Sequence, residues 1–382
     1  EAQVVGFRDN QTLLMPLGDI FGIEPGCTIE VTEELPSFGV CSEMIGRVLD
    51  GNGKPIDGKG PIPLGTEYPL MGTPLNPLSR ERAKKSLDVG VKSINGLLTC
   101  AKGQRIGIMA GTGVGKSILL GMIARNTEAE VNVIALIGER GREVKEFIEE
   151  NLGPEGLKRS IVIAAASDQP PLVRLRGAFI ATTIAEYFRD QGKDVLLMMD
   201  SITRFALAQR EIGLSVGEPP TTKGFPPSTF SMLPKILERA GTSEGDGTIT
   251  GLYTVLVEGD DISEPVSDAV RAVLDGHIVL DRELAAHNHY PAIDVLASVS
   301  RLMIDVISKE HYDLSMKLKD FLATYNEAKD LINIGAYAKG SNPKWDIAID
   351  KIDRINAYLK QGIMESVSMG ESLSKLKEIV ES

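Results

Sequence analysis

The sequence has few cysteines, few aromatic residues and no long hydrophobic segment. Its 382 residues include three cysteines, Cys27, Cys41 and Cys100, and 5% aromatic residues. Cysteines this few and this widely spaced form neither a metal-ligand pair nor the disulfide framework of a small secreted protein. The pattern favours a reducing, cytoplasmic compartment. Because no apolar segment approaches the roughly 18 residues that cross a bilayer, we expect membrane association only through partners.

An excess of basic residues is also missing. The chain has 41 Lys and Arg against 53 Asp and Glu, for a net charge of -12. Nucleic-acid binding draws its affinity from clustered Lys and Arg, so this balance argues against a protein whose main task is to bind nucleic acid, while it leaves room for a local basic groove. Hydrophobic residues make up 42% and charged residues 25%, which is typical of a folded globular protein of two or three domains.

The pattern of apolar and polar residues changes twice along the chain. Residues 1–32 alternate between Gly, Pro and Asp breaks, which predicts short antiparallel strands. Because the sequence begins within such a strand, we expect it to start inside a small β-barrel domain of which this is a remnant. The Gly- and Pro-rich residues 50–77 indicate a connecting segment, and residues beyond 303 have helical periodicity.

Between residues 104 and 280, short apolar runs alternate with amphipathic segments. Such runs predict a parallel sheet that is buried on both faces. They lie at residues 105–109, 131–137, 161–165, 195–199 and 249–257. We therefore divide the chain into the β-remnant at 1–32, an α/β core at 33–310 and a helical domain at 311–382.

A glycine-rich segment, AGTGVGKS at residues 110–117, connects a predicted strand to a predicted helix. In this context the backbone amides surround phosphate groups, the helix N-terminus adds positive charge, Lys116 reaches the outer phosphates and Ser117 binds Mg²⁺. Ala110 replaces the usual first glycine at the end of the strand, where a methyl group is tolerated. The alternative is a glycine-rich turn without a ligand. The predicted nucleotide-binding residues are Gly111, Thr112, Gly113, Val114, Gly115, Lys116, Ser117 and Ile118.

Two carboxylates follow other predicted strands of this sheet. Asp200 ends the run at 195–199 and is a candidate ligand of Mg²⁺, although it could be a solvated strand end. Glu139 follows the run at 131–137, so it is a candidate to orient and polarise the attacking water. On spacing alone, Glu139 is equally well explained as a residue at the start of a helix.

Several segments resemble the catalytic subunits of rotary ATPases, and the resemblance covers nearly the whole chain. They are AGTGVGKS at 110–117, GER at 138–140, LMMDSITRF at 197–205, YPAID at 290–294 and SVSR at 298–301. Within that group, residues 217–228, 232–241 and 335–343 resemble the type III protein export ATPases, most of all the bacterial flagellar one. The resemblance implies a P-loop, RecA-like core with a mostly parallel sheet.

The resemblance also implies roles for single residues. Glu139 corresponds to the catalytic glutamate, Asp200 to the magnesium aspartate, and Arg301 to an arginine that reaches the nucleotide of the neighbouring subunit. A guanidinium suits that role because its charge is permanent and its donors match phosphate oxygens. Without the resemblance, Arg301 would be interpreted as a surface ion-pair residue.

Other assignments stay open at this stage. Tyr290 either stacks on adenine or only packs at a strand end, and Arg140 and Arg204 either support the phosphate pocket, Arg140 as a catalytic residue, or are structural. The loop at 217–227 either faces the central axis of a ring, where a stalk protein contacts it, or is an ordinary exposed loop. His287 and His289 predict a solvated turn rather than a metal site.

The implied activity is Mg²⁺-dependent ATP hydrolysis by a homo-hexameric ring that drives flagellar protein export. The implied partners are a central stalk protein, peripheral regulators, export substrates and chaperones that dock on the C-terminal helices, and a membrane export gate. The implied location is the cytoplasm, peripheral to the inner face of the cytoplasmic membrane. The resemblance implies the hexamer for the full-length protein. Because the β-domain of which residues 1–32 are a remnant helps to close such rings, we expect the truncated chain to be a weakly active monomer.

Three other functions fit parts of the sequence. The ATPase of a virulence-type injection apparatus would share every catalytic residue. A ring-shaped RNA translocase would share the P-loop core, but the acidic balance and the lack of a basic, aromatic-rich segment disfavour it. A non-catalytic nucleotide-binding ring subunit typically lacks the glutamate that stands here at position 139.

Overall fold

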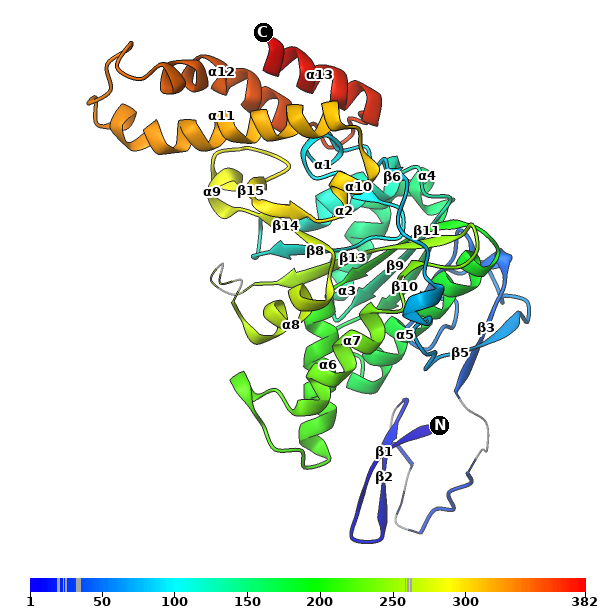
Figure 1. Ribbon diagram of the computed structural model, residues 1–382. Coiled ribbons are helices and arrows are strands. Elements are labelled where there is room, and N and C mark those ends of the chain that lie inside the picture. Colours follow the sequence, from blue (N-terminus) through cyan, green and yellow to red (C-terminus); the bar gives the residue numbers. More distant parts are fainter. Residues whose placement is uncertain are drawn as a thin grey trace.

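The structure is a computed structural model that describes residues 1–18, 21–22, 24, 26–31, 36–257, 259, 261 and 263–382. A large sheet with helices on both faces forms the centre of the molecule (Figure 1). Long C-terminal helices lie at one end of this core, and a small N-terminal hairpin lies at the other. Among the described residues, no helix combines the length and apolar character that a membrane span requires.

The central sheet is mostly parallel, as the sequence predicts. Its strand order is β15-β14-β8-β13-β11-β9-β10-β4, and the short β12 pairs with β13. The two antiparallel pairs are β14 with β15 and β12 with β13. The strands are β4 (Val48–Asp50), β8 (Arg105–Ala110), β9 (Val131–Ile137), β10 (Ser160–Ala165), β11 (Asp194–Asp200), β12 (Gly241–Thr242), β13 (Thr248–Leu256), β14 (Gly276–Leu280) and β15 (Ile293–Ser300).

Strand β9 explains why the predicted runs are continuously apolar. All seven of its residues are buried. Val133 and Ala135 pack in the cluster with α5 and α6, whereas Ile134 and Leu136 pack in the cluster with α1 and α2 on the other face. Because alternate residues of a strand face opposite ways, a strand covered on both sides needs apolar residues at every position.

Nine helices of the core are found among the described residues, and they fill the connections between the strands. They are α1 (Lys92–Leu97), α2 (Lys116–Asn126), α3 (Gly141–Glu146), α4 (Gly153–Leu157), α5 (Pro171–Asp190), α6 (Ile202–Ser215), α7 (Pro227–Leu237), α8 (Pro265–Val273) and α9 (Arg282–Ala286). A π-helical segment, Phe147–Leu152, joins α3 to α4. Each strand-to-helix connection therefore places a loop at the carboxyl edge of the sheet, where α/β proteins bind ligands.

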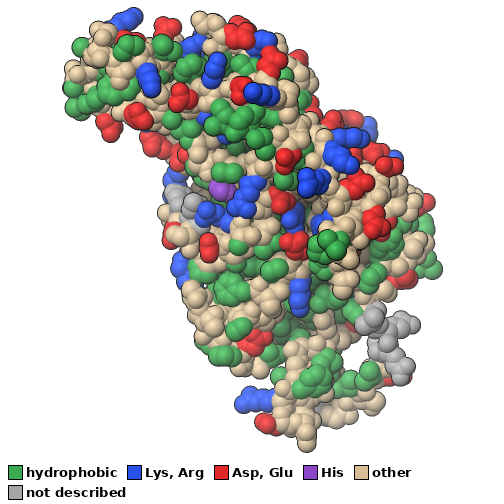
Figure 2. Space-filling model, in the orientation of Figure 1, with side chains coloured by type: hydrophobic (Ala, Val, Ile, Leu, Met, Phe, Trp, Pro, Cys, Tyr) green, Lys and Arg blue, Asp and Glu red, His purple; other side chains and the backbone are tan. Residues whose placement is uncertain are grey.

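The C-terminal region is helical, as predicted. It contains α10 (Met303–Val306), α11 (Lys309–Asn333), α12 (Pro343–Leu359) and α13 (Met369–Glu381). Ser308, Asn342 and Ser368 cap the last three helices with side-chain oxygens, each of which accepts a backbone N–H. On the face shown in Figure 2, acidic, basic and hydrophobic side chains are intermixed over these helices. Ile347, which belongs to the apolar periodicity, is 48% exposed.

The N-terminal region has the short antiparallel strands that the sequence predicts. Strand β1 (Ala2–Arg8) pairs with β2 (Gln11–Pro16). Farther along, β3 (Ser37–Val40) pairs with β5 (Thr66–Pro69), and β6 (Ser86–Leu87) with β7 (Cys100–Ala101). Residues 19, 20, 23, 25 and 32 of the predicted β-remnant lie outside the described residues.

Residues 50–77 contain short strands that the sequence analysis did not predict. The segment was expected to connect other elements and to hold no long one; in the structure Asp50 ends β4, which pairs in parallel with β10, and residues 66–69 form β5. The Gly and Pro breaks hide these strands because the strands are only three or four residues long.

Candidate functional site

The glycine-rich segment connects β8 to α2, in the strand-to-helix context that a phosphate site requires. Strand β8 ends at Ala110 and α2 begins at Lys116. Gly113 and Gly115 have φ angles of +80° and +87°, a conformation that side chains other than glycine rarely adopt. The loop therefore curls back before α2, and the first N–H groups of that helix remain free to bind an anion.

Three charged side chains meet beside this loop. The Nζ atom of Lys116 contacts the Oδ1 atom of Asp200 and lies 3.3 Å from the Oε1 atom of Glu139. Asp200 ends β11, and Glu139 follows β9 across one intervening residue, Gly138. Because β9 and β11 are parallel neighbours with Asp200 opposite Leu136, their carboxyl ends present both carboxylates at one edge. The structure thus brings together three of the predicted site residues.

Thr254 is a member of this cluster that the sequence analysis missed. Its Oγ1 atom donates a hydrogen bond of 2.6 Å to the Oδ1 atom of Asp200. It lies in β13, between β8 and β11. Thr254 is fully buried, so the hydrogen bond fixes the orientation of the carboxylate. In the sequence, Thr254 is one polar residue within an apolar run, and only the pairing of strands reveals its partner.

Burial and charge set the protonation of the cluster. Burial raises the pKa of Glu139 to about 7; the Lys116 ammonium lowers it and the charge of Asp200 raises it further. For Lys116, burial favours the neutral amine, but the charges of Asp200 and Glu139 more than compensate and raise its pKa. A lysine that stays charged beside a carboxyl that titrates near neutral pH is suited to hold an anion next to a base.

We expect kcat/KM for ATP to rise with pH and to reach half its maximum near pH 7. The carboxyl group of Glu139 can accept a proton only when it is ionised, and its raised pKa leaves it largely protonated below about pH 6. Single-turnover hydrolysis at low ATP, followed between about pH 5.5 and 8.5, measures this profile. Glu139→Gln is the control, because the protonation of ATP itself affects the rates of both proteins in the same way. Parallel profiles for the two proteins would contradict the assignment.

Arg140 and Arg204 occupy different environments. The side chain of Arg140 is 82% exposed, and its Nη1 atom lies 3.6 Å from Glu143, so it forms an ion pair at the surface. Arg204 lies on α6 against Gly138, where an added Cβ would be 2.8 Å from the Cβ atom of Arg204. With Thr112, Arg204 lines a cavity of about 480 Å³ beside the glycine-rich loop.

Tyr290 lies against the same loop. A Cβ atom added at Gly115 would be 3.3 Å from the Cε1 atom of Tyr290, and Tyr290 is 38% exposed. Its carbonyl oxygen accepts a hydrogen bond of 2.9 Å from the backbone N–H of Gln361, and the buried side chain of Gln361 donates to the carbonyl oxygen of Gly90 at 2.7 Å. The C-terminal region therefore holds the backbone that carries this aromatic ring, a connection that no sequence pattern indicates.

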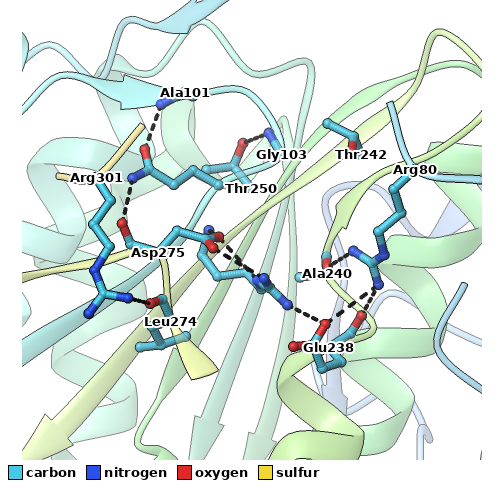
Figure 3. Close-up of polar contacts among 12 residues, drawn as sticks. Arg80, Ala101, Gly103, Glu238, Ala240, Thr242, Thr250, Leu274, Asp275 and Arg301 are labelled. Carbon is cyan, nitrogen blue, oxygen red and sulfur yellow. Dashed lines mark hydrogen bonds and ion pairs between the residues drawn. The ribbon is translucent and has the colours of Figure 1, made fainter. Parts of the chain in front are cut away.

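Arg301 is at the opposite edge of the sheet. Strand β15 runs antiparallel to β14, so Ser300 pairs with Gly276 at the start of β14, whereas Leu280 at its other end pairs with Ala110. The four residue steps from Gly276 to Leu280 span about 13 Å at the usual strand rise. Arg301 is exposed, and its Nη1 atom donates to the carbonyl oxygen of Leu274 at 3.4 Å, a hydrogen bond that Figure 3 shows as a dashed line. Arg301 is thus separate from the Lys116 cluster of its own chain.

The structure also gives the exposure of His287 and His289 and the packing of one aromatic ring in the Pro-rich loop at 217–227. His287 is exposed in a turn, as predicted, but His289 is buried rather than solvated, which corrects the prediction for that residue. Among the residues that the structure describes, no three or more His, Cys, Asp and Glu side chains gather into a group that could hold a metal ion. In the loop at 217–227, Phe225 is buried beneath Arg210, whose guanidinium lies 5.0 Å from the ring centre.

Comparisons with known proteins show the family to which the chain belongs. Residues 90–300 match the nucleotide-binding domain of the ATP synthase alpha/beta family, and residues 307–378 match the C-terminal domain of the EscN ATPase of type III secretion systems. The chain is 52% identical to the flagellum-specific ATP synthase of Pseudomonas aeruginosa, over 100% of this chain and 84% of that protein. It is 50% identical to the type 3 secretion system ATPase of Xanthomonas euvesicatoria, over 94% and 81% of the two chains.

The solved structures include two of EscN from the type III secretion system of enteropathogenic E. coli. The assembled ATPase superposes with a TM-score of 0.94 at 45% identity, over 99% of this chain and 92% of that one. EscN in complex with its central stalk EscO superposes with a TM-score of 0.92, at the same identity and coverage. The predicted resemblance is confirmed: the chain belongs to the ATP synthase alpha/beta family, within its group of flagellum-specific and type III secretion ATPases, and is an ATP-hydrolysing enzyme of protein export.

Proposed function

We propose that this chain is the catalytic subunit of a hexameric ring in which Mg-ATP hydrolysis drives flagellar protein export. The observation that carries the proposal is the convergence of Lys116, Asp200 and Glu139 beside the glycine-rich loop. In this site Lys116 and the amides of residues 111–118 bind the phosphates. Tyr290 stacks on the adenine, since its ring already lies against Gly115.

Ser117 and Asp200 are the residues that would hold Mg²⁺. Hydroxyl and carboxylate oxygens are the donors that this hard cation prefers, and Thr254 already fixes the Asp200 carboxylate. When bound, Mg²⁺ supplies positive charge that polarises the phosphate oxygens. The side chains of the protein orient the reactants and accept a proton. Lys116 holds the outer phosphates, while Glu139 binds the attacking water and accepts its proton.

The catalytic site is completed by a neighbouring subunit. Arg301 lies at the opposite end of β14 from the glycine-rich loop and is exposed, so it is available to a second copy of the chain. The assembly of the related EscN supports this arrangement. Arg140 joins the phosphate site only if its exposed side chain turns inward from Glu143.

The partners follow from the same family. EscN binds its central stalk EscO, and we propose that the loop at 217–227 makes the equivalent contact here. Helices α11 and α12, with exposed Met316, Leu331 and Ile347, are the proposed docking surface for chaperones and export substrates. Peripheral regulators and the membrane export gate would hold the ring at the cytoplasmic face of the membrane.

A Lys116→Ala variant tests the proposed site. We expect ATP to bind about 10- to 100-fold more weakly, because the variant loses charge-assisted hydrogen bonds to the phosphates. A fluorescent ATP analogue, titrated into folded protein, measures the dissociation constant. Lys145→Ala is the matched control, since Lys145 is 73% exposed and forms only a surface ion pair. Equal affinity in Lys116→Ala and the parent would refute the site and the function together.

The 50% identity to a type 3 secretion system ATPase supports a second candidate, export through an injection apparatus. Both functions use the same catalytic residues, so only a cellular measurement separates them. Loss of swimming motility on disruption of the gene would support the flagellar function, whereas intact motility would favour the injection apparatus.

A further inference from the structure

Behind Arg301, charged side chains from four separate segments form a continuous network (Figure 3). Arg105, at the start of β8, binds the Asp275 carboxylate through its Nε atom at 3.1 Å and its Nη2 atom at 3.2 Å. The Nη1 atom of Arg105 also lies 2.5 Å from the Oε2 atom of Glu238. Arg80 donates to the carbonyl oxygens of Glu238 and Ala240. Asp275 is therefore held by a bidentate ion pair at its side chain.

The backbone of Asp275 is in turn bonded to Arg301. The Arg301 N–H donates to the Asp275 carbonyl oxygen at 3.0 Å. The buried Gln104 donates to the same oxygen at 3.3 Å and to the Ser300 Oγ atom at 3.1 Å, and Ser300 donates to Thr99 at 2.8 Å. The backbone at Ser300 and Arg301 is thus held by hydrogen bonds, while Arg301 as a whole is exposed.

This arrangement suits a side chain that must meet a target on another molecule. An arginine has many rotamers, and an error of about 1 Å in the position of a catalytic group can cost about 100-fold in rate. A rigid attachment of the backbone reduces the conformations that the guanidinium must search. The residues that hold Asp275 and Arg301 do not contact Lys116, Glu139 or Asp200 of the same chain. The network therefore lies at the edge of the sheet that is opposite the chain's own phosphate site.

We propose that Asp275, held by Arg105, which also pairs with Glu238, is a positioning residue for Arg301. It sets the direction in which the guanidinium reaches the nucleotide of the neighbouring subunit. Glu238 directly follows α7, and α7 follows the loop at 217–227, so the network joins the proposed stalk-contacting segment to the arginine. The inference rests on the proposed intersubunit role of Arg301.

An Asp275→Asn variant tests the inference. The substitution preserves the shape of the side chain but removes the charge that orients Arg105. We expect kcat to fall about 10- to 100-fold, with KM for ATP changed less than about twofold, since the variant's own phosphate site is intact. The assay uses protein concentrations at which the rate per subunit no longer rises.

Mixed assemblies distinguish a misplaced arginine from a general loss of structure. A Glu139→Gln subunit cannot hydrolyse its own nucleotide but supplies a normal Arg301. In a random equal mixture with Asp275→Asn, about one interface in four combines an intact site with a normal arginine, so activity should recover toward a quarter of wild type. An equal mixture of Asp275→Asn with Arg301→Ala should not recover, because neither subunit supplies a well-placed arginine.

Two further variants keep the test decisive. Asp194→Asn is the matched control, because Asp194 lies at the same edge of the sheet and binds Lys102 at 2.7 Å; we expect kcat within about twofold of wild type. Glu238→Gln, at a residue whose side chain is 40% exposed, should show the same recovery pattern as Asp275→Asn. Wild-type kcat in a folded Glu238→Gln protein would contradict the network even if Asp275→Asn failed to fold.

The outcomes separate the inference from the proposed function. If Arg301→Ala recovers with Glu139→Gln but Asp275→Asn does not, Arg301 acts between subunits and Asp275 does not position it. If neither mixture recovers, the intersubunit role of Arg301 itself is wrong.

Discussion

Replacing Arg301 by alanine should lower the rate of ATP hydrolysis about 10³- to 10⁵-fold, the range typical of arginine fingers. The guanidinium carries a permanent charge, and its donors match the oxygens of the phosphoryl group in the transition state. Its position at the far end of β14 from Lys116 means that this stabilisation must come from another subunit. ATP binding should change far less, because the P-loop is untouched.

The decisive measurement is again a mixture. Equal amounts of Arg301→Ala and Glu139→Gln should recover up to about a quarter of the wild-type rate, although each protein alone is nearly inactive. Arg354→Ala is the control: Arg354 is 44% exposed and forms a surface ion pair with Glu378, so its loss should leave the rate unchanged. A mixture as inactive as its components would place Arg301 outside the catalytic site.

Replacing Glu139 by glutamine should lower kcat about 10²- to 10⁴-fold, the usual contribution of a general base. Glutamine keeps the size of the side chain but cannot accept a proton from the attacking water. Nucleotide affinity should be retained or slightly increased, since Lys116 loses one of its two carboxylate partners and is freer to bind phosphate. Rapid-quench hydrolysis and a binding titration separate the two effects.

Glu143→Gln is the matched control for this variant. Glu143 lies in the first turn of α3, four residues after Glu139 in the sequence; it is 46% exposed and pairs with Arg140. Its carboxyl group interacts with that of Glu139, and this contact raises the pKa of Glu139 and lowers that of Glu143. We therefore expect Glu143→Gln to shift the pH profile while it preserves most of kcat. A larger loss of kcat in Glu143→Gln than in Glu139→Gln would show that Glu143, and not Glu139, is the base.

The strands and helices were predictable where local patterns are long and regular. The five apolar runs became β8, β9, β10, β11 and β13, because a strand buried on both faces needs apolar residues throughout. Strands β4 and β5 were missed, since three or four residues among glycines and prolines carry no detectable periodicity. Their stability comes from partners that are distant in the sequence, β10 and β3.

The candidate site was predictable to the extent that its residues follow a motif or a strand end. Lys116 belongs to a glycine-rich motif, and Asp200 and Glu139 follow apolar runs, so all three could be placed at one edge of the sheet. Thr254, Gln361 and Asp275 could not be found in this way. Each acts through a partner 54 or more residues away, as with Thr254 and Asp200, and no local pattern records such pairs.

The sequence by itself determined the long buried strands, the helical character of the C-terminal region and the position of the phosphate-binding loop, because these depend on residues close together in the chain. Only the tertiary structure decided the order and register of the strands. That order places Thr254 on Asp200, brings Glu139 to Lys116 and sends Arg301 to the opposite edge behind Asp275. The physical reason is that buried charges and hydrogen bonds are satisfied by whichever groups the packed sheet brings within reach, however far apart they are in the chain.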